Sequence, residues 1–324
     1  MEYCYSKECN LKLSEAEGLE IDVVFRMHKD WAKEVKGTLD MQKEWNMHVS
    51  SIDGYNGGLG RQYQFMSATI PECLPERLEI ISYANEFAFL YDDKLENMDT
   101  INPAAESYGL LDAFSDVLNQ QSSASSRREK KLQAKILSKM MAIDGRRAAV
   151  MMNSWATFVN SAARVRVSPP DTLEEYIPAR VIDAGELIWF GFITFGMALT
   201  IPDNEYEKCH TLAKPAYAAL GLTNDLFSWN KERDAARRAG QTCVFNAIWV
   251  IMREKSVTEA EAKMICRAEI RRWISTYRCI VDNAKEDMSL SKDLRTYLEA
   301  LLLSYVGNLV WSITCPRYNE YPCR

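Results

Sequence analysis

The stretch NDLFSWNKE, residues 224–232, sets an amide, a hydroxyl and a carboxylate four residues apart. Asn224, Ser228 and Glu232 would therefore share one face of an α-helix, within about 80° of each other. Their oxygen atoms are hard ligands, which suit Mg²⁺ and suit zinc or copper poorly. Because Mg²⁺ usually takes its other ligands from water and a substrate phosphate, the stretch indicates half of a site for a phosphorylated substrate.

A second acidic stretch, FLYDDKLEN, lies about 130 residues earlier in the chain. Asp92 and Glu96 are four residues apart and would share a helix face, with Asp93 beside them. Either motif alone is also typical of an ordinary solvated helix face. Both motifs in one helical chain predict that two distant helices bring oxygen ligands to a shared cluster of magnesium ions.

Composition excludes several classes of protein. A net charge of −6 without a basic stripe argues against nucleic-acid binding. Nine Cys without a CxxC pair and only three His disfavour structural zinc. The start MEYCYSKECN does not resemble a signal peptide, and scattered Cys indicate a reducing, cytoplasmic setting. The apolar runs 187–202 and 300–316 are shorter than the roughly 20 residues of a membrane span, so we expect buried helices there.

Apolar residues recur at helical spacing, and no strand pattern or repeat is found. We expect one all-α domain, 1–324, with an irregular N-terminal segment (1–20) and a tail (319–324). YNGGLG, residues 55–60, predicts a turn, and Gly185 in IDAGE should break a helix and free backbone groups to face a ligand. The basic run 233–243 is expected to be a loop. The expected helices cover residues 22–45, 61–70, 76–93, 104–120, 129–165, 172–200 in two pieces, 206–232, 245–255, 258–281 and 290–314.

Together, DDKLE and NDLFSWNKE resemble the two metal motifs of class I terpene cyclases, the aspartate-rich motif and the NSE triad. The ending Cys315-Pro316-Arg317-Tyr318 resembles the arginine–tyrosine pair of microbial members. CLPERLEIISYANEFAFLYDD and GNLVWSITCPRY are similar to the cyclase halves of fungal chimeric terpene synthases, which make diterpenes and sesterterpenes. The similarity runs from about residue 3 to residue 318 and implies the single-domain helical bundle of isoprenoid synthases.

The resemblance implies roles for individual residues. Asp92 would bind Mg²⁺ directly, while Asp93 and Glu96 would orient the site. A second set of metal ligands would be Asn224, Ser228 and Glu232, and three Mg²⁺ ions are expected together with the substrate diphosphate. The residues that would contact diphosphate are Lys231, Arg317 and Tyr318. Arg180, which lies 44 residues before Asn224, resembles the diphosphate-sensing arginine, with Asp183 and Ala184 as the linker and effector residues.

The expected chemistry needs no nucleophile and no general base. Metal ions and cationic donors neutralise the charge of the leaving diphosphate. The carbocation that remains requires a dry, apolar pocket with electron-rich ring faces. For any single aromatic residue, core packing is the favoured explanation; the best candidates for the pocket are Phe65, Phe89 and Trp311.

The resulting interpretation is a Mg-dependent class I terpene cyclase. It would ionise geranylgeranyl or geranylfarnesyl diphosphate and cyclise the carbocation to a polycyclic di- or sesterterpene, with release of diphosphate. Two alternatives stay open: a trans-prenyltransferase of the same fold, which would carry two aspartate-rich motifs, and a non-catalytic helical isoprenoid-binding protein. A fused C-terminal prenyltransferase domain, a homo-oligomer, the substrate length and the product skeleton are also left open.

Overall fold

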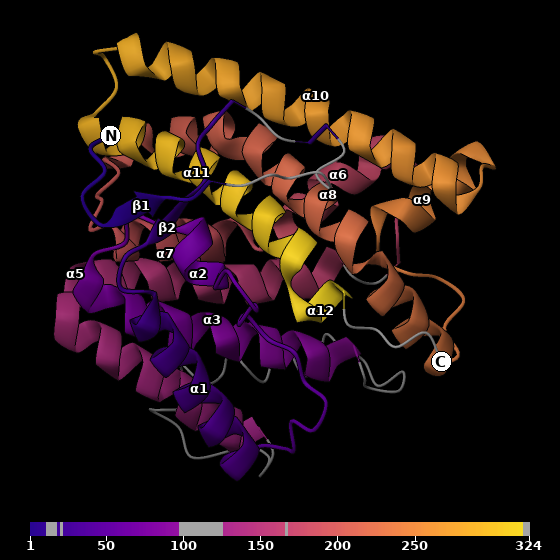
Figure 1. Ribbon diagram of the computed structural model, residues 1–324, viewed down its shortest axis with the longest axis horizontal. Coiled ribbons are helices and arrows are strands. Elements are labelled where there is room, and N and C mark those ends of the chain that lie inside the picture. The colour runs from indigo at the N-terminus through magenta and orange to yellow at the C-terminus, as the bar shows by residue number, and fades with distance from the viewer. Residues whose placement is uncertain (11–17, 20–21, 97–125, 166–167, 320–324) are drawn as a thin grey trace.

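The computed structural model describes residues 1–10, 18–19, 22–96, 126–165 and 168–319, and most of them are helical (Figure 1). The all-α fold class predicted from the sequence is therefore confirmed. The described helices are α1 (Trp31–His48), α2 (Phe65–Thr69), α3 (Pro75–Glu96), α5 (Ser126–Val165), α6 (Leu173–Asp183), α7 (Glu186–Gly196), η1 (Asp203–Glu205), α8 (Tyr206–Arg238), α9 (Ala247–Lys255), α10 (Glu259–Glu286), α11 (Lys292–Thr314) and α12 (Pro316–Asn319). The helix expected at 104–120 lies outside the described residues.

Two short strands lie near the N-terminus, one within residues 1–20 and one just after them, so the expectation of no strand was wrong. β1 (Ser6–Glu8) pairs antiparallel with β2 (Arg26–His28), and Ser6 lies opposite His28. The buried carboxylate of Glu72 accepts hydrogen bonds from the backbone N–H groups of residues 4, 5 and 6, at 2.8, 3.0 and 2.9 Å. Strands of three residues are too short to show an alternating pattern, and here their position depends on this distant glutamate.

Two helix boundaries differ most from expectation. The first helix begins at Trp31 and not at residue 22, because residues 26–28 pair as a strand. Helix α8 continues through the basic run to Arg238, so the loop expected over 233–243 begins later. Arg233 explains part of this extension, since its guanidinium donates to Asp234 and to Glu259 of α10, both at 3.0 Å. The pair with Glu259 links the end of α8 to α10.

The two long apolar runs form buried helices. The first run supplies nearly all of α7, which packs on α5, and the second supplies the C-terminal part of α11, which packs on α8 and α2. Gly307 lets α11 approach α2 closely, because a Cβ at this position would lie 2.0 Å from the carbonyl oxygen of Ala68. In the part of the chain that the structure describes, no helix is long and apolar enough to cross a membrane.

The chain breaks between α6 and α7 at Gly185, as the sequence predicted. Gly185 has a φ of +83°, a left-handed conformation that favours glycine. Helix α6 therefore ends at Asp183, beside α8. On α8, Gly221 leaves room for this approach, since a Cβ there would lie 3.2 Å from Cγ of Arg180 and 3.5 Å from Cβ of Ala184.

Candidate active site

The expected site residues lie where the C-terminal ends of α3 and α6 meet α8 and α12. In Figure 1 the ends of α3 and α8 and the short α12 lie toward the same side of the molecule. These elements are between 44 and 224 positions apart in sequence at their points of contact, yet hydrogen bonds and ion pairs join all four helices. The side chain of Glu96, at the end of α3, lies outside the described residues.

Asp93 of the acidic motif is bound by two cationic side chains from other helices. Arg317 of α12 donates from Nη2 to Oδ1 at 2.5 Å and from Nη1 to Oδ2 at 3.0 Å. Lys231 of α8 lies 2.9 Å from the same Oδ1. Asp92 is farther away, with Oδ2 at 3.9 Å from Nη2 of Arg317. The end of α3 is thus tied to the two residues that the resemblance assigned to diphosphate.

Arg180 connects α6 to the start of the NDLFSWNKE stretch. It donates from Nη2 to Oδ1 of Asn224 at 2.6 Å, and from Nη1 to Asp183. Asn224 in turn donates from Nδ2 to the Tyr318 hydroxyl at 2.7 Å. One amide side chain therefore joins α6 to α12. Ala184 is exposed and contributes its backbone N–H to the carbonyl oxygen of Arg180 at 2.7 Å.

The electrostatics of Arg180 depend on Asp225, a residue that the sequence analysis did not single out. Asp225 is fully buried; its Oδ1 accepts from Nε of Arg180 at 2.7 Å, and its Oδ2 accepts from the Tyr176 hydroxyl at 2.7 Å. Burial raises the pKa of Asp225, while the Arg180 charge opposes this shift. Burial also acts to lower the pKa of Arg180, but Asp225 and its other neighbours raise it well above the ordinary value, so the guanidinium stays charged.

Asn246 is a second residue that the sequence analysis did not identify. It is fully buried at the N-cap of α9, and its Nδ2 donates to Oε2 of Glu232 and to the carbonyl oxygen of Asp225, both at 2.9 Å. Asn before an apolar helix is a capping signal, which could have located Asn246 but not its contact with Glu232. Burial, together with the charge of Asp225, raises the pKa of Glu232.

The donor set on α8 fits a hard divalent cation. Ser228 is buried and its hydroxyl has no partner at hydrogen-bonding geometry, although it lies close enough to Glu232 to lower the pKa of that carboxyl. An unpaired buried oxygen between an amide and a carboxylate is suited to Mg²⁺. Within the described residues, no three His, Cys, Asp or Glu side chains converge on one point. A metal here would therefore combine the Glu232 carboxylate with the neutral oxygen atoms of Asn224 and Ser228 and with oxygen ligands from other elements or from a bound substrate.

The three aromatic candidates contact one another next to this network. The Phe65 ring centroid lies 4.7 Å from that of Trp311 and 5.2 Å from that of Phe89. Phe89 and Trp311 are stacked at 6.0 Å, and Cζ of Arg317 lies 5.0 Å from the centre of the Phe89 ring. Trp189 of α7 joins the cluster at 5.6 Å from Phe65. Arg317 thus links the aromatic cluster to the charged network.

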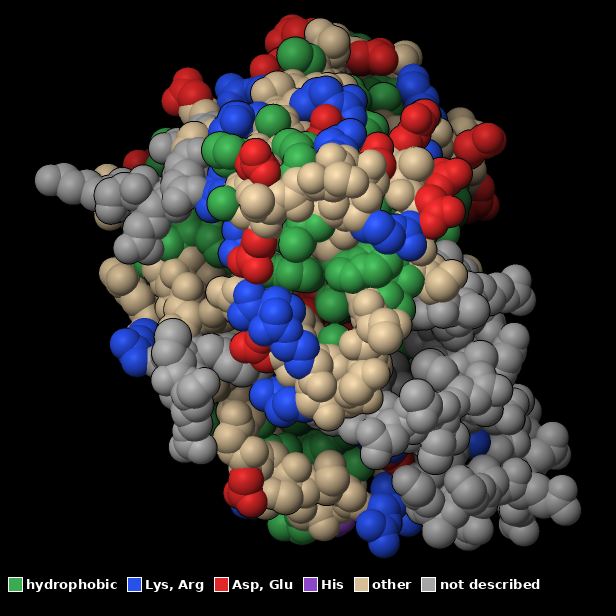
Figure 2. Space-filling view, turned by 90° about the vertical axis from the view of Figure 1, so that its right-hand side faces the viewer, with side chains coloured by type: hydrophobic (Ala, Val, Ile, Leu, Met, Phe, Trp, Pro, Cys, Tyr) green, Lys and Arg blue, Asp and Glu red, His purple; other side chains and the backbone are tan. Residues whose placement is uncertain are grey.

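Figure 2 shows the side of the molecule where these helix ends lie. Lysine, arginine and acidic side chains lie close together near its centre, beside a group of hydrophobic side chains.

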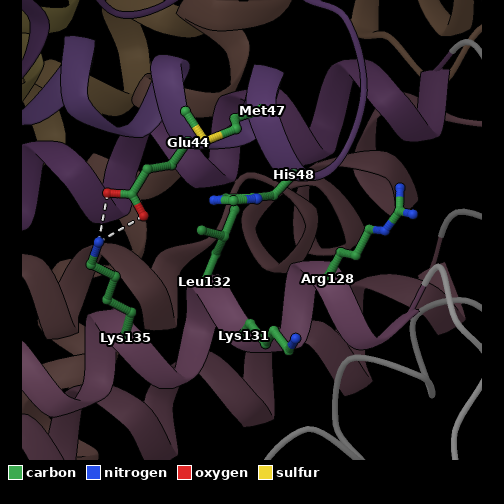
Figure 3. Close-up of a pocket in the computed structure, with 7 residues that line it drawn as sticks. All are labelled: Glu44, Met47, His48, Arg128, Lys131, Leu132 and Lys135. Atoms are coloured by element: carbon green, nitrogen blue, oxygen red, sulfur yellow. Dashed lines mark hydrogen bonds and ion pairs between the residues drawn. The ribbon is translucent and has the colours of Figure 1, made fainter.

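A separate cavity of about 450 Å³ lies between α1 and the N-terminal part of α5 (Figure 3). Its lining includes Glu44 and Lys135, whose charged ends are 2.7 Å apart, and His48. Among the residues that the structure describes, none of the expected site residues lines it. The contacts around Asp93 and Asn224 therefore locate the candidate active site, and this cavity does not.

The chain belongs to the terpene synthase family. Residues 83–276 match the family described as "Terpene synthase family 2, C-terminal metal binding". The fold is similar to that of aristolochene synthase from Penicillium roqueforti, with a TM-score of 0.70 and 19% identity over 91% of this chain and 99% of that chain. It is also similar to wild-type cucumene synthase, with a TM-score of 0.68 and 14% identity over 91% of this chain and 99% of that chain.

Sequence relatives are fungal diterpene and sesterterpene synthases. The chain is 40% identical to fusicoccadiene synthase of Phomopsis amygdali, over 98% of this chain and 46% of the relative. It is 42% identical to a bifunctional type I diterpene synthase of Aspergillus flavipes, over 99% of this chain and 42% of the relative. A bifunctional sesterterpene synthase of Aspergillus aculeatus is 38% identical, over 98% of this chain and 45% of the relative. The chain spans less than half the length of these relatives.

Proposed function

We propose that this chain is a magnesium-dependent class I terpene cyclase acting on geranylgeranyl or geranylfarnesyl diphosphate. The product would be a polycyclic di- or sesterterpene, formed with release of diphosphate. One observation carries the proposal: Asn224, at the start of the triad, is bound on one side to Arg180 and on the other to Tyr318. A predicted metal ligand and two predicted diphosphate donors therefore already meet in one place.

The metal ligands of the proposal are the oxygen-bearing side chains of α3 and α8. Asp92 would supply one carboxylate and the α8 triad the rest, with Asp93 and Glu96 orienting the acidic end of α3. Three bound Mg²⁺ ions would neutralise the charge that develops on the leaving diphosphate. The unpaired Ser228 hydroxyl supports this assignment, since a buried hydroxyl otherwise finds a partner.

The diphosphate donors of the proposal are Arg180, Lys231, Arg317 and Tyr318. Guanidinium groups match phosphate oxygens in geometry, and a buried donor stabilises a developing negative charge strongly. Burial raises the pKa of Tyr318, so its hydroxyl remains a hydrogen-bond donor at neutral pH. Asp183 and Ala184 would connect Arg180 to the chain break at Gly185, where backbone groups can face the substrate.

The aromatic cluster would receive the hydrocarbon part of the substrate. Phe65, Phe89 and Trp311 offer ring faces that stabilise a nearby cation and exclude water. The substrate length is proposed from the relatives, which are named as diterpene and sesterterpene synthases. Two of these names also say "bifunctional", and a prenyltransferase is the proposed partner domain, since it would make the substrate. A cytoplasmic location accords with both activities.

The test is incubation of the chain with Mg²⁺ and diphosphates of fifteen, twenty and twenty-five carbons, followed by gas chromatography. Asp92→Ala and Asn224→Ala should each lower hydrocarbon formation by more than about 100-fold. Loss of a residue that only supports a metal ligand typically costs about 10- to 100-fold, so loss of a ligand itself should cost more. The matched control is Asp171→Ala, which removes a largely exposed carboxylate outside the site. Hydrocarbon at the wild-type rate in both site variants would contradict the metal assignment, and chain elongation upon addition of isopentenyl diphosphate would favour a prenyltransferase.

A further inference from the structure

The loop YNGGLG, residues 55–60, lies directly on a buried carboxylate. Gly57 and Gly58 are buried, and a Cβ on Gly57 would lie only 1.9 Å from Oε1 of Glu86. A Cβ on Gly58 would lie 3.2 Å from Oε2 of the same residue. The two glycines therefore allow the backbone of the loop to contact Glu86 without intervening side chains, which is a stronger requirement than a turn alone imposes.

Glu86 accepts a hydrogen bond from this loop at one oxygen atom and from α1 at the other. Oε2 accepts from the backbone N–H of Gly58 at 3.0 Å, and Oε1 accepts from Nε2 of Gln42 at 2.7 Å. The Glu86 side chain is fully buried in the middle of α3, seven residues before Asp93. It has no part in the metal and diphosphate assignments above, so its burial requires another explanation.

The other face of the loop holds residues of the candidate site. The carbonyl oxygen of Gly58 accepts from Nε1 of Trp311 at 2.9 Å and from the backbone N–H of Phe65 at 3.2 Å. The carbonyl oxygen of Asn56 accepts from Nη1 of Arg317 at 2.9 Å. A single peptide chain thus connects Glu86 to two rings of the aromatic cluster and to one diphosphate donor.

We propose that Glu86 is a positioning residue that fixes Trp311 and Phe65 through the Gly58 peptide and thereby determines which hydrocarbon products form. The proposal rests on the terpene cyclase function proposed above. Glu86 does not touch the substrate; it acts on the ring faces that stabilise the carbocation. Since cation–ring attraction depends on where the ring lies, a shift of Trp311 changes the relative barriers of competing cyclisation and proton-loss steps.

Glu86→Gln is the first test, because it removes one of the two acceptors. The neutral amide oxygen accepts a weaker hydrogen bond from the Gly58 N–H than the carboxylate does, so the loop loosens even where Gln42 turns its amide toward the new Nε2 group. The ratio of hydrocarbon products should change by at least about threefold, while the rate of diphosphate release falls less than about tenfold, which corresponds to roughly 1.4 kcal/mol. A product ratio equal to that of the wild type would overturn the proposal.

Exchange of the two side chains provides a rescue. In the double variant Glu86→Gln with Gln42→Glu, the introduced amide can donate to the introduced carboxylate and still accept from Gly58 N–H. The product ratio should return to within about twofold of wild type. A double variant as altered as the single one would contradict the proposed role. Glu72→Gln is the matched control, since Glu72 also binds backbone N–H groups but holds the N-terminal segment, and it should leave the product ratio unchanged.

Hydrogen exchange tests the same link without substrate or metal. A peptide covering residues 51–64 should exchange faster in Glu86→Gln than in wild type, and at the wild-type rate in the double variant. Unchanged exchange in Glu86→Gln would overturn the positioning role of Glu86, whereas a wild-type protein that makes no hydrocarbon would overturn the cyclase function. The two proposals can therefore fail separately. If Glu86→Gln does not fold, Gly57→Ala decides the question: it displaces the loop from Glu86, and an unaltered product ratio in this variant would refute the positioning role.

Discussion

Arg317 and Asp93, which lie 224 residues apart, form a bidentate pair with hydrogen bonds of 2.5 and 3.0 Å. Lys231 contacts the same carboxylate at 2.9 Å. Two cations proposed to bind diphosphate are therefore neutralised by the acidic motif of α3. The oxygen atoms of a bound diphosphate would compete with Asp93 for Arg317 and Lys231. Other cations that bind the carboxylate of Asp93 would release these two donors, so cation binding at Asp93 should strengthen diphosphate binding.

Asp93→Asn should strengthen the binding of inorganic diphosphate in the absence of Mg²⁺. The change removes the charge that competes for Arg317 and Lys231, and we expect about tenfold tighter binding, equivalent to roughly 1.4 kcal/mol, by titration calorimetry at low salt. Asp144→Asn is the control, because Asp144 also binds two arginines, Arg77 and Arg147, away from the site. Equal or weaker diphosphate binding by Asp93→Asn would show that this pair does not restrain the donors.

Arg180→Ala should lower the free energy of unfolding by about 3–5 kcal/mol at neutral pH, because it leaves the buried carboxylates of Asp225 and Asp183 without their cation. Asp225→Asn should lower the free energy of unfolding less in the Arg180→Ala variant than in wild type, because in that variant it removes a buried carboxylate that has already lost its cation. Urea unfolding followed by circular dichroism measures both steps. The reference is Arg253→Ala, which breaks an exposed pair with Asp171 and should cost less than about 1 kcal/mol. Additive losses for Arg180 and Asp225 would contradict the buried coupling.

Gly185→Ala should destabilise the protein more than Gly240→Ala. Both glycines have positive φ, +83° and +65°, so alanine costs about 1–2 kcal/mol at either position. At Gly185 the new Cβ would also lie 2.6 Å from Cγ2 of Ile188, whereas nothing lies within 4 Å at Gly240. We expect an additional loss of about 1–3 kcal/mol in thermal or urea unfolding. Equal losses for the two variants would mean that the break between α6 and α7 adjusts freely.

Glu34 should make the protein less stable as pH rises. Burial raises its pKa from 4.5 to about 7, although hydrogen bonds from the backbone N–H groups of Met66 and Ser67 partly oppose the shift. A group that binds its proton more tightly when folded stabilises the fold fully below pH 4.5, and this contribution is lost as pH rises to about 7. The loss amounts to about 3 kcal/mol.

The measurement compares wild type and Glu34→Gln by urea unfolding at pH 5, 6, 7 and 8. The glutamine variant cannot titrate at this position, so its unfolding free energy should fall by about 3 kcal/mol less between pH 5 and pH 8. Titrating groups that do not interact with Glu34 contribute equally to both proteins and cancel in the difference. Parallel pH curves for the two proteins would show that Glu34 titrates near its ordinary value.

Several features were predictable from sequence because they depend on neighbouring residues. The i, i+4, i+8 spacing of Asn224, Ser228 and Glu232 places them on one face of α8 wherever that helix lies. The positive φ of Gly185 follows from the absence of a side chain, and the break between α6 and α7 was predicted correctly. The all-α fold class was also confirmed. The chemical roles of the site residues remain predictions.

Other features depend on contacts between distant residues, and no local pattern encodes them. The sequence showed neither the burial of Asp225 against Arg180 nor the strand pair held by Glu72. It marked YNGGLG as a turn, but only the tertiary structure brought Gly58 between Glu86 and Trp311. Helical periodicity arises from backbone sterics over a few residues, whereas the partner of a buried polar group is chosen by packing of the whole chain. The sequence therefore determined the helices and the donor types, and the tertiary structure decided which donors and acceptors meet.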